Sequence, residues 1–164
     1  MINNFVFDAD VAAKKIYISR EFNAPVEAVW RAWTEPDLIK RWIAPKPWKA
    51  ETRTWDFTVG GTWLYAMIGT EGQKHWVYAE FTAIEEGRTF STMGRFCDGE
   101  GNPLPDGPKS YRVNQFSSIN EDRSKVDTVI TFEDEATIKM FVEMGFREGT
   151  MMSLDNLDKL LAAE

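Results

Sequence analysis

The last thirty residues constrain the fold most, because they carry an amphipathic pattern that is broken by small residues. From Asp134 to Ala163 the apolar residues recur with a 3.6-residue period, which predicts one long helix. One face of this helix is a stripe that contains Ile138, Val142, Gly145, Phe146, Gly149, Met152, Ser153, Asn156, Leu157 and Leu160. The opposite face contains Arg147, Glu148, Asp155 and Asp158. The centre of the stripe is small, although Gly costs about 1 kcal/mol against Ala inside a helix. Two interpretations stay open: the stripe packs very closely on a sheet, or it borders an open space.

The chain length and the aromatic content suggest one domain built around large side chains. With 164 residues we expect one domain over residues 14–164, preceded by an N-terminal arm or edge strand over residues 1–13. The sequence holds 7 Trp and 11 Phe. Such side chains fill cores and also line sites for apolar ligands, so either use is open.

The net charge of the chain excludes some classes of binding partner. A net charge of −7 repels phosphate backbones, so we expect no nucleic-acid binding and no attachment to an acidic membrane surface. No apolar run is long enough to cross a bilayer, and Met1–Phe5 lacks the basic start of a signal peptide. Cys97 is the only cysteine, which excludes an intrachain disulfide. These features together predict a cytoplasmic protein.

The order of predicted elements is a strand, two short helices, six strands and the long helix. Lys14–Phe22 alternates as a strand, a helix opens at Pro25, and Thr34 is the expected N-cap of a second short helix. The six later strands are expected near Lys49–Phe57, Thr62–Ile68, His75–Ile84, Arg88–Cys97, Tyr111–Ile119 and Val126–Phe132. Short turns between successive strands predict antiparallel pairing, and the longer Asp98–Pro108 segment is expected to be a lid or an insertion. One antiparallel sheet with a helix across it is the expected α+β arrangement.

Four motifs in this order resemble those of a known family. They are Trp30-Arg31-Ala32-Trp33-Thr34-Glu35-Pro36, Arg41-Trp42, Asp56-Phe57-x-Val59-Gly60-Gly61-x-Trp63-x-Tyr65-x-Met67, and Gly145-x-x-Glu148-Gly149-x-x-x-Ser153-Leu154-x-x-Leu157. Over residues 15–162 the chain resembles bacterial relatives of the C-terminal domain of the heat-shock protein 90 ATPase activator, within the START-like or SRPBCC superfamily. The resemblance implies a helix-grip fold, in which a curved antiparallel sheet of about six or seven strands wraps around the C-terminal helix and leaves a deep apolar cavity.

The sequence departs from the family pattern in two places. Relatives usually carry Trp where this chain has Thr150, directly after the Glu-Gly pair. We expect the missing indole to enlarge or reshape one end of the cavity. The Asp98–Pro108 segment is also longer than is usual, so we expect a different cavity mouth.

The candidate ligand-binding residues follow from the strand alternation and from the helix stripe. Trp63, Tyr65 and Met67 alternate along one strand and therefore share one face. The expected ligand-binding set is Trp33, Trp42, Trp63, Tyr65, Met67, Ala79, Phe81, Phe146, Gly149 and Ser153. The polar groups expected to orient a ligand are Tyr65, Gln115, Ser153 and Asn156.

We expect no catalytic residue, no metal and no cofactor. His75 has no partner at metal-ligand spacing and follows a turn, and Cys97 has no nearby histidine. Asp56, Glu80 and Glu148 are the carboxylates to examine, and a structural ion pair or hydrogen bond is the favoured role of Glu148.

Three functions compete. The first hypothesis is a binder of a small apolar or aromatic ligand in an internal cavity. The alternatives are a chaperone-associated, stress-response interaction module and a cyclase-like or hydrolase-like enzyme that uses the same cavity. Both a monomer and a homodimer paired through an edge strand near Phe5 stay open.

Overall fold

The computed structural model describes residues 4–105 and 108–163. Its elements are β1 (Val6–Asp10), β2 (Lys15–Phe22), α1 (Val26–Thr34), α2 (Pro36–Ile39), β3 (Lys49–Trp55), β4 (Thr62–Ile68), β5 (Lys74–Glu85), β6 (Thr89–Cys97), β7 (Ser110–Asn120), β8 (Arg123–Phe132), α3 (Glu135–Glu143) and α4 (Phe146–Ala162). Parts of two predicted segments, the N-terminal arm and the Asp98–Pro108 loop, lie outside the described residues.

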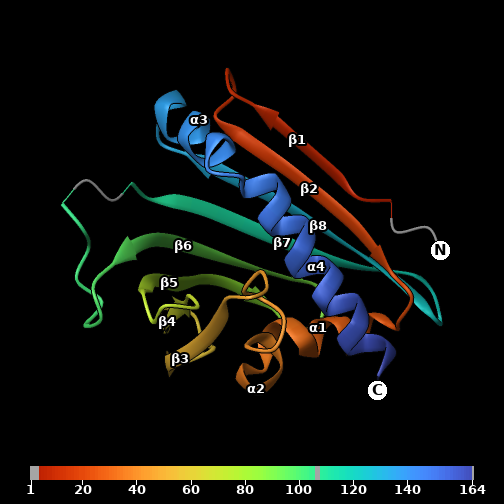
Figure 1. The fold of residues 1–164 in the computed structure, drawn as a ribbon. Coiled ribbons are helices and arrows are strands. Elements are labelled where there is room, and N and C mark those ends of the chain that lie inside the picture. Colours follow the sequence, from red (N-terminus) through yellow and green to blue (C-terminus); the bar gives the residue numbers. More distant parts are fainter. Residues whose placement is uncertain (1–3, 106–107, 164) are drawn as a thin grey trace.

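One antiparallel sheet forms the framework. Its strand order is β1-β2-β8-β7-β6-β5-β4-β3, so β2 pairs with β8 and closes the gap between the first strands and the last one (Figure 1). The eight strands exceed the expected six or seven, because Val6–Asp10 pairs with Lys15–Ser19 at the edge. The α+β helix-grip prediction is confirmed.

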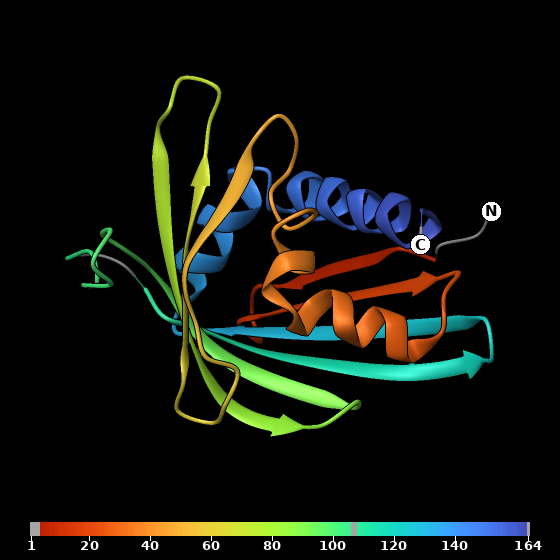
Figure 2. The same ribbon diagram turned by 90° about the horizontal axis from the view of Figure 1, so that it is seen from below.

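The sheet is strongly curved. Figure 2 shows β3, β4 and β5 standing nearly upright against the plane of β1, β2, β7 and β8. Register shifts in β3 between Thr52 and Thr54 and in β5 between Phe81 and Ala83 mark irregular pairing, and such bulges bend a strand. The helices α1 and α4 lie on the concave face (Figures 1 and 2).

The predicted single helix over Asp134–Ala163 is wrong. The chain forms two helices, α3 and α4, which are separated at Met144 and Gly145. Gly145 has φ +86°, a left-handed conformation that ends a helix and that glycine adopts without strain. The apolar period continues through this break, which is why the pattern alone did not reveal it.

The buried face of α4 differs in part from the predicted stripe. The fully buried positions of α4 are Ser153, Leu154, Leu157 and Leu161. Val142 and Met152, both assigned to the stripe, are about two-fifths exposed. The stripe prediction is therefore wrong at these two positions.

A second local prediction also fails. Thr34 is the last residue of α1, and its Oγ1 donates to the Trp30 carbonyl at 2.8 Å. The N-cap of α2 is Glu35, and its side chain makes no capping bond. The hydroxyl of Thr34 therefore completes the first helix and does not cap the second.

Aromatic packing between α1 and β7 fills one end of the concave face. Trp30 and Trp33 contact Phe116 with ring centroids 5.0 and 5.4 Å away. Trp33 also lies against Trp42, whose Nε1 donates to the Ala32 carbonyl at 3.0 Å. This solid end of the core fixes the helices α1 and α2 relative to the sheet.

Candidate functional site

A cavity of about 570 Å³ lies between the concave sheet and α4. Small-molecule sites in proteins range from about 300 to 1,000 Å³, so this space suits a small ligand. All ten expected ligand-binding residues line it: Trp33, Trp42, Trp63, Tyr65, Met67, Ala79, Phe81, Phe146, Gly149 and Ser153. Their contact with a ligand stays a prediction.

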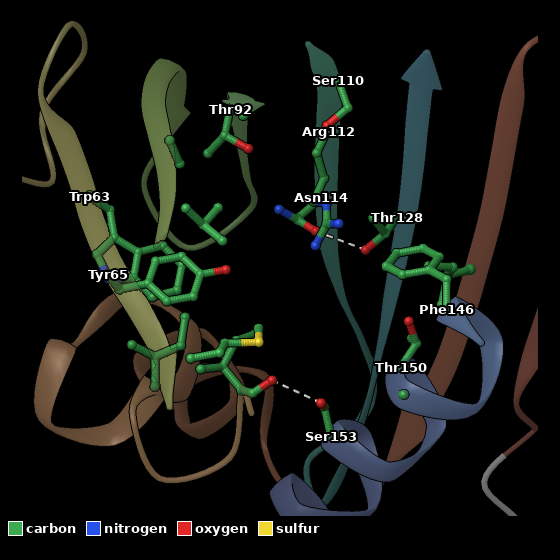
Figure 3. Close-up of a pocket in the computed structure, with 18 of the residues that line it drawn as sticks. Trp63, Tyr65, Thr92, Ser110, Arg112, Asn114, Thr128, Phe146, Thr150 and Ser153 are labelled. Atoms are coloured by element: carbon green, nitrogen blue, oxygen red, sulfur yellow. Dashed lines mark hydrogen bonds between the residues drawn. The ribbon is translucent and has the colours of Figure 1, made fainter. Parts of the chain in front are cut away.

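Stacked aromatic rings from β4 form one wall (Figure 3). Trp63 and Tyr65 stack with centroids 3.9 Å apart and planes 17° apart. The Trp63 Nε1 donates to Thr52 Oγ1 at 3.1 Å, which fixes the indole. Trp55 supports the same indole in an edge-on contact at 5.3 Å. The wall is thus flat, apolar and rigidly held.

Small residues of α4 form the facing wall. A Cβ placed on Gly149 would meet only Cγ of Pro45, at an ordinary contact distance of 3.6 Å, and a Cβ on Gly145 would meet nothing within 4 Å. Close packing therefore does not require glycine at either position. The small residues of the stripe were interpreted either as close packing on the sheet or as the border of an open space, and the structure supports the second interpretation.

Two other small polar residues of the stripe join α4 to the segment after α2. Ser153 Oγ donates to the Ile43 carbonyl at 2.8 Å, and Asn156 Nδ2 donates to the Ala44 carbonyl at 3.3 Å. Asn156 lies outside the cavity lining, so its expected role in orienting a ligand is wrong. The same expectation is wrong for Gln115, which is exposed, because alternation turns its neighbour Asn114 inward.

Besides Tyr65 and Ser153, further polar groups enter the cavity from β7 and β8, and these are not among the residues predicted from the sequence. Arg112 and Asn114 extend from β7 into the space, beside Thr128 of β8 (Figure 3). Thr128 Oγ1 donates to Asn114 Oδ1 at 2.8 Å. Alternation from the buried Phe116 places Asn114 and Arg112 on the same face, so the signal was present in the pattern.

Burial changes the acidity of the two ionisable groups that face each other there. It lowers the pKa of the Arg112 guanidinium, an effect that Tyr65 opposes. It raises the pKa of Tyr65 to about 12, an effect that Arg112 opposes. At neutral pH the arginine is charged, and the phenol keeps its proton and acts as a hydrogen-bond donor.

Arg20 is a second arginine on the cavity lining, and it is neutralised. Its side chain is 1% exposed and pairs with Asp155 at 2.9 Å and with Asp158. The sequence pattern placed both carboxylates on the face opposite the stripe, and both are at least partly exposed, but it did not predict their pairing with Arg20. The pairing joins α4 to β2, the strand that carries Arg20. Burial raises the pKa of Asp158, against the opposing effect of Arg20.

The other reactive candidates lie away from the cavity interior. His75 is exposed at the rim, where its ring lies 5.4 Å from Trp48, and with the exposed Met144 it marks the opening. Cys97 is buried, and burial raises the pKa of its thiol, which disfavours the nucleophilic thiolate.

The three carboxylates singled out from the sequence do not line the cavity. Asp56 accepts from Thr58 Oγ1 in an exposed turn. Glu80 belongs to β5 and is absent from the lining. Glu148 is exposed, and within residues 4–105 and 108–163 it makes no side-chain hydrogen bond or ion pair, so its expected structural bond is wrong. The same residues hold no group of three or more His, Cys, Asp or Glu arranged for a metal ion.

Thr150 lines the cavity next to Phe146 (Figure 3). Thus the position that departs from the family pattern faces the candidate ligand space.

Among the described helices, none has the length and apolarity needed to cross a membrane.

Comparison with known proteins connects this architecture to a family. The family model described as "Activator of Hsp90 ATPase homolog 1-like protein" matches residues 23–162. A search of curated proteins found no match.

Solved structures with the same fold cover nearly the whole chain. A protein from Arthrobacter aurescens is 31% identical, with a TM-score of 0.89 over 97% of this chain and 92% of that one. A protein from Mycobacterium smegmatis is 28% identical, with a TM-score of 0.88 over 97% of both chains. A protein from Staphylococcus epidermidis is 22% identical, with a TM-score of 0.84 over 96% of this chain and 94% of that chain, and shows the fold alone.

Proposed function

The chain belongs to the Activator of Hsp90 ATPase homolog 1-like family, and from this premise we propose that it binds a small, largely apolar ligand between its curved sheet and α4. The observation that carries the proposal is the 570 Å³ cavity, which has an aromatic wall on one side and small residues on the other. The apolar burial contributes roughly 25 cal/mol per Å² before the costs of binding.

Substitution of Gly149 gives the sharpest test of ligand binding, because this residue lines the cavity and close packing does not require glycine there. Ser153 is less suitable, since its hydroxyl bonds to Ile43 and any substitution also removes that bond. A leucine at position 149 projects a branched side chain into the cavity. An alanine adds a single methyl group at ordinary contact distance from Pro45.

The experiment titrates the neutral fluorescent probe N-phenyl-1-naphthylamine into the wild-type protein and both variants. Saturable binding to the wild type is expected, with affinity at least ten-fold weaker for Gly149→Leu and far less weakened for Gly149→Ala. Circular dichroism checks that both variants are folded. If the wild type shows no saturable binding, or if the leucine and alanine variants bind equally well, the cavity is not the binding site.

A chaperone-associated role is a second proposal, motivated by exposed apolar side chains at the α3–α4 junction. Met140, Val142 and Met144 are 40%, 41% and 67% exposed. The direct test measures the ATPase rate of a purified heat-shock protein 90 with the wild-type protein and with Met144→Glu. Stimulation that the charged variant loses supports the role, and an unchanged ATPase rate with the wild type contradicts it.

A further inference from the structure

Three arginines line the cavity, Arg20, Arg95 and Arg112, and two of them, Arg20 and Arg112, are in opposite electrostatic situations. The Arg95 guanidinium lies over the Tyr78 ring, with its Cζ 5.1 Å from the ring centroid. Arg20 has two carboxylate partners, Asp155 and Asp158. The side chain of Arg112 has neither an ion pair nor a hydrogen bond in the part of the chain that the structure describes. No Asp or Glu of the described residues lines the cavity, so no carboxylate of the lining compensates the positive charge of Arg112.

The polar neighbours of Arg112 are donors. Asn114 uses its Oδ1 to accept from Thr128, which leaves its Nδ2 hydrogens available on the cavity side. The Tyr65 hydroxyl points into the same space from the opposite wall (Figure 3). A guanidinium, an amide N–H and a phenol O–H therefore face the same cavity, whose lining offers the guanidinium no carboxylate, and a charge that is shielded from water normally has a partner.

We propose that the ligand of this cavity carries a carboxylate, which pairs with the Arg112 guanidinium while the apolar body of the ligand lies against Trp63 and Tyr65. This inference rests on the proposed function. A guanidinium presents two parallel N–H groups that match the two oxygens of a carboxylate, so pairing is directional as well as electrostatic. The Asn114 amide and the Tyr65 hydroxyl supply further donors to the same oxygens.

The test compares 2-naphthoate with 2-naphthamide, which has nearly the same shape and no charge. Each compound is titrated calorimetrically into the wild type, Arg112→Met and Arg112→Lys. The wild type is expected to bind the acid at least ten-fold more tightly than the amide. Arg112→Met is expected to reduce this preference to about one, and Arg112→Lys to retain part of it, because lysine keeps the charge without the fork of two donors.

The matched control is Arg88→Met, which removes the same charge from a side chain that is 76% exposed. It is expected to keep the preference for the acid. If the control also loses the preference, general charge and not Arg112 is responsible, and the inference fails.

Arg112→Met has a second readout that needs no ligand. Because the substitution removes an unpaired charge from the apolar cavity wall, the melting temperature of the variant is expected to rise above that of the wild type. A fall in melting temperature would indicate that Arg112 has a structural partner and would overturn the inference.

The outcomes separate the two proposals. No binding of N-phenyl-1-naphthylamine to the wild type contradicts the proposed function. Binding of that probe, with equal affinities for acid and amide or with a preference that survives in Arg112→Met, overturns the carboxylate inference alone.

Discussion

The guanidinium of Arg20, on β2, lies 2.9 Å from the carboxylate of Asp155, on α4, and joins two segments 135 residues apart in the chain. Asp158, one helical turn further along α4, contacts the same guanidinium. Arg20 is almost fully buried, whereas the side chains of Asp155 and Asp158 are 50% and 27% exposed. The ion pairs that join α4 to the sheet thus combine a buried guanidinium with carboxylates that are partly exposed.

Because the arginine is buried and the carboxylates are not, we expect removal of the carboxylates and removal of the arginine to lower the free energy of unfolding by different amounts. The double variant Asp155→Asn/Asp158→Asn leaves a buried charge without a partner, and we expect it to lower the free energy of unfolding by about 3 kcal/mol. Arg20→Met is expected to cost less, because its partners are partly exposed and can hydrate. Urea unfolding at neutral pH measures both. A larger loss for Arg20→Met would contradict the assignment.

Gly149→Ala is expected to stabilise the protein. Alanine favours a helix interior over glycine by about 1 kcal/mol, and the added methyl group meets only Pro45 at 3.6 Å. We therefore expect the free energy of unfolding to rise by about 0.5 to 1 kcal/mol in urea unfolding. A decrease would show that α4 packs more closely here than the structure indicates.

The same substitution at Gly145 is expected to have the opposite sign. Its φ of +86° disfavours any residue with a Cβ, although a Cβ would have open space around it. Gly145→Ala is expected to lower the free energy of unfolding by about 1 to 2 kcal/mol, and Gly145→Asn by less, since Asn tolerates this backbone region. Equal stability of the alanine variant and the wild type would contradict a left-handed residue between α3 and α4.

Tyr65 links stability to alkaline pH. Its pKa rises from 10.0 to about 12 on folding, so between these values the unfolded state releases a proton that the folded state retains. The free energy of unfolding therefore falls as pH rises through this window, by an amount on the order of 2 kcal/mol. Tyr65→Phe removes this contribution, which is measured as the wild-type minus variant difference at about pH 9 and about pH 11.5. A difference that does not change with pH would show that Tyr65 is not buried as described.

Much of the fold followed from the sequence, because alternation and turn chemistry fix strands locally. The strand at Thr62–Ile68 was predicted at its observed bounds. The small residues Gly149 and Ser153 in the helix stripe made an open space one of two interpretations, and both residues line the cavity. The break at Gly145 did not follow, since a left-handed residue leaves the apolar period on either side intact.

The roles of the charged residues around the cavity could not be predicted from the sequence, for a different reason. Whether a carboxylate faces solvent or a buried arginine depends on the rotation of α4 against β2, which no local pattern encodes. The pairing of Asp155 and Asp158 with Arg20 was therefore not predicted. Arg112 was predictable in principle, because it lies four residues before the buried Phe116 on the same strand face. Its charge, which is typical of a solvent-facing position, argued against that placement.

Nuclear magnetic resonance can locate a probe bound to the protein and so show whether the space between the sheet and α4 is the binding site. Intermolecular nuclear Overhauser effects between N-phenyl-1-naphthylamine and the protein are expected for side-chain protons of Trp63 and Tyr65 and for the α-protons of Gly149. Such contacts would place the probe between the sheet and α4. Contacts confined to the exposed Met140 and Val142, with none to the three cavity residues, would contradict the account.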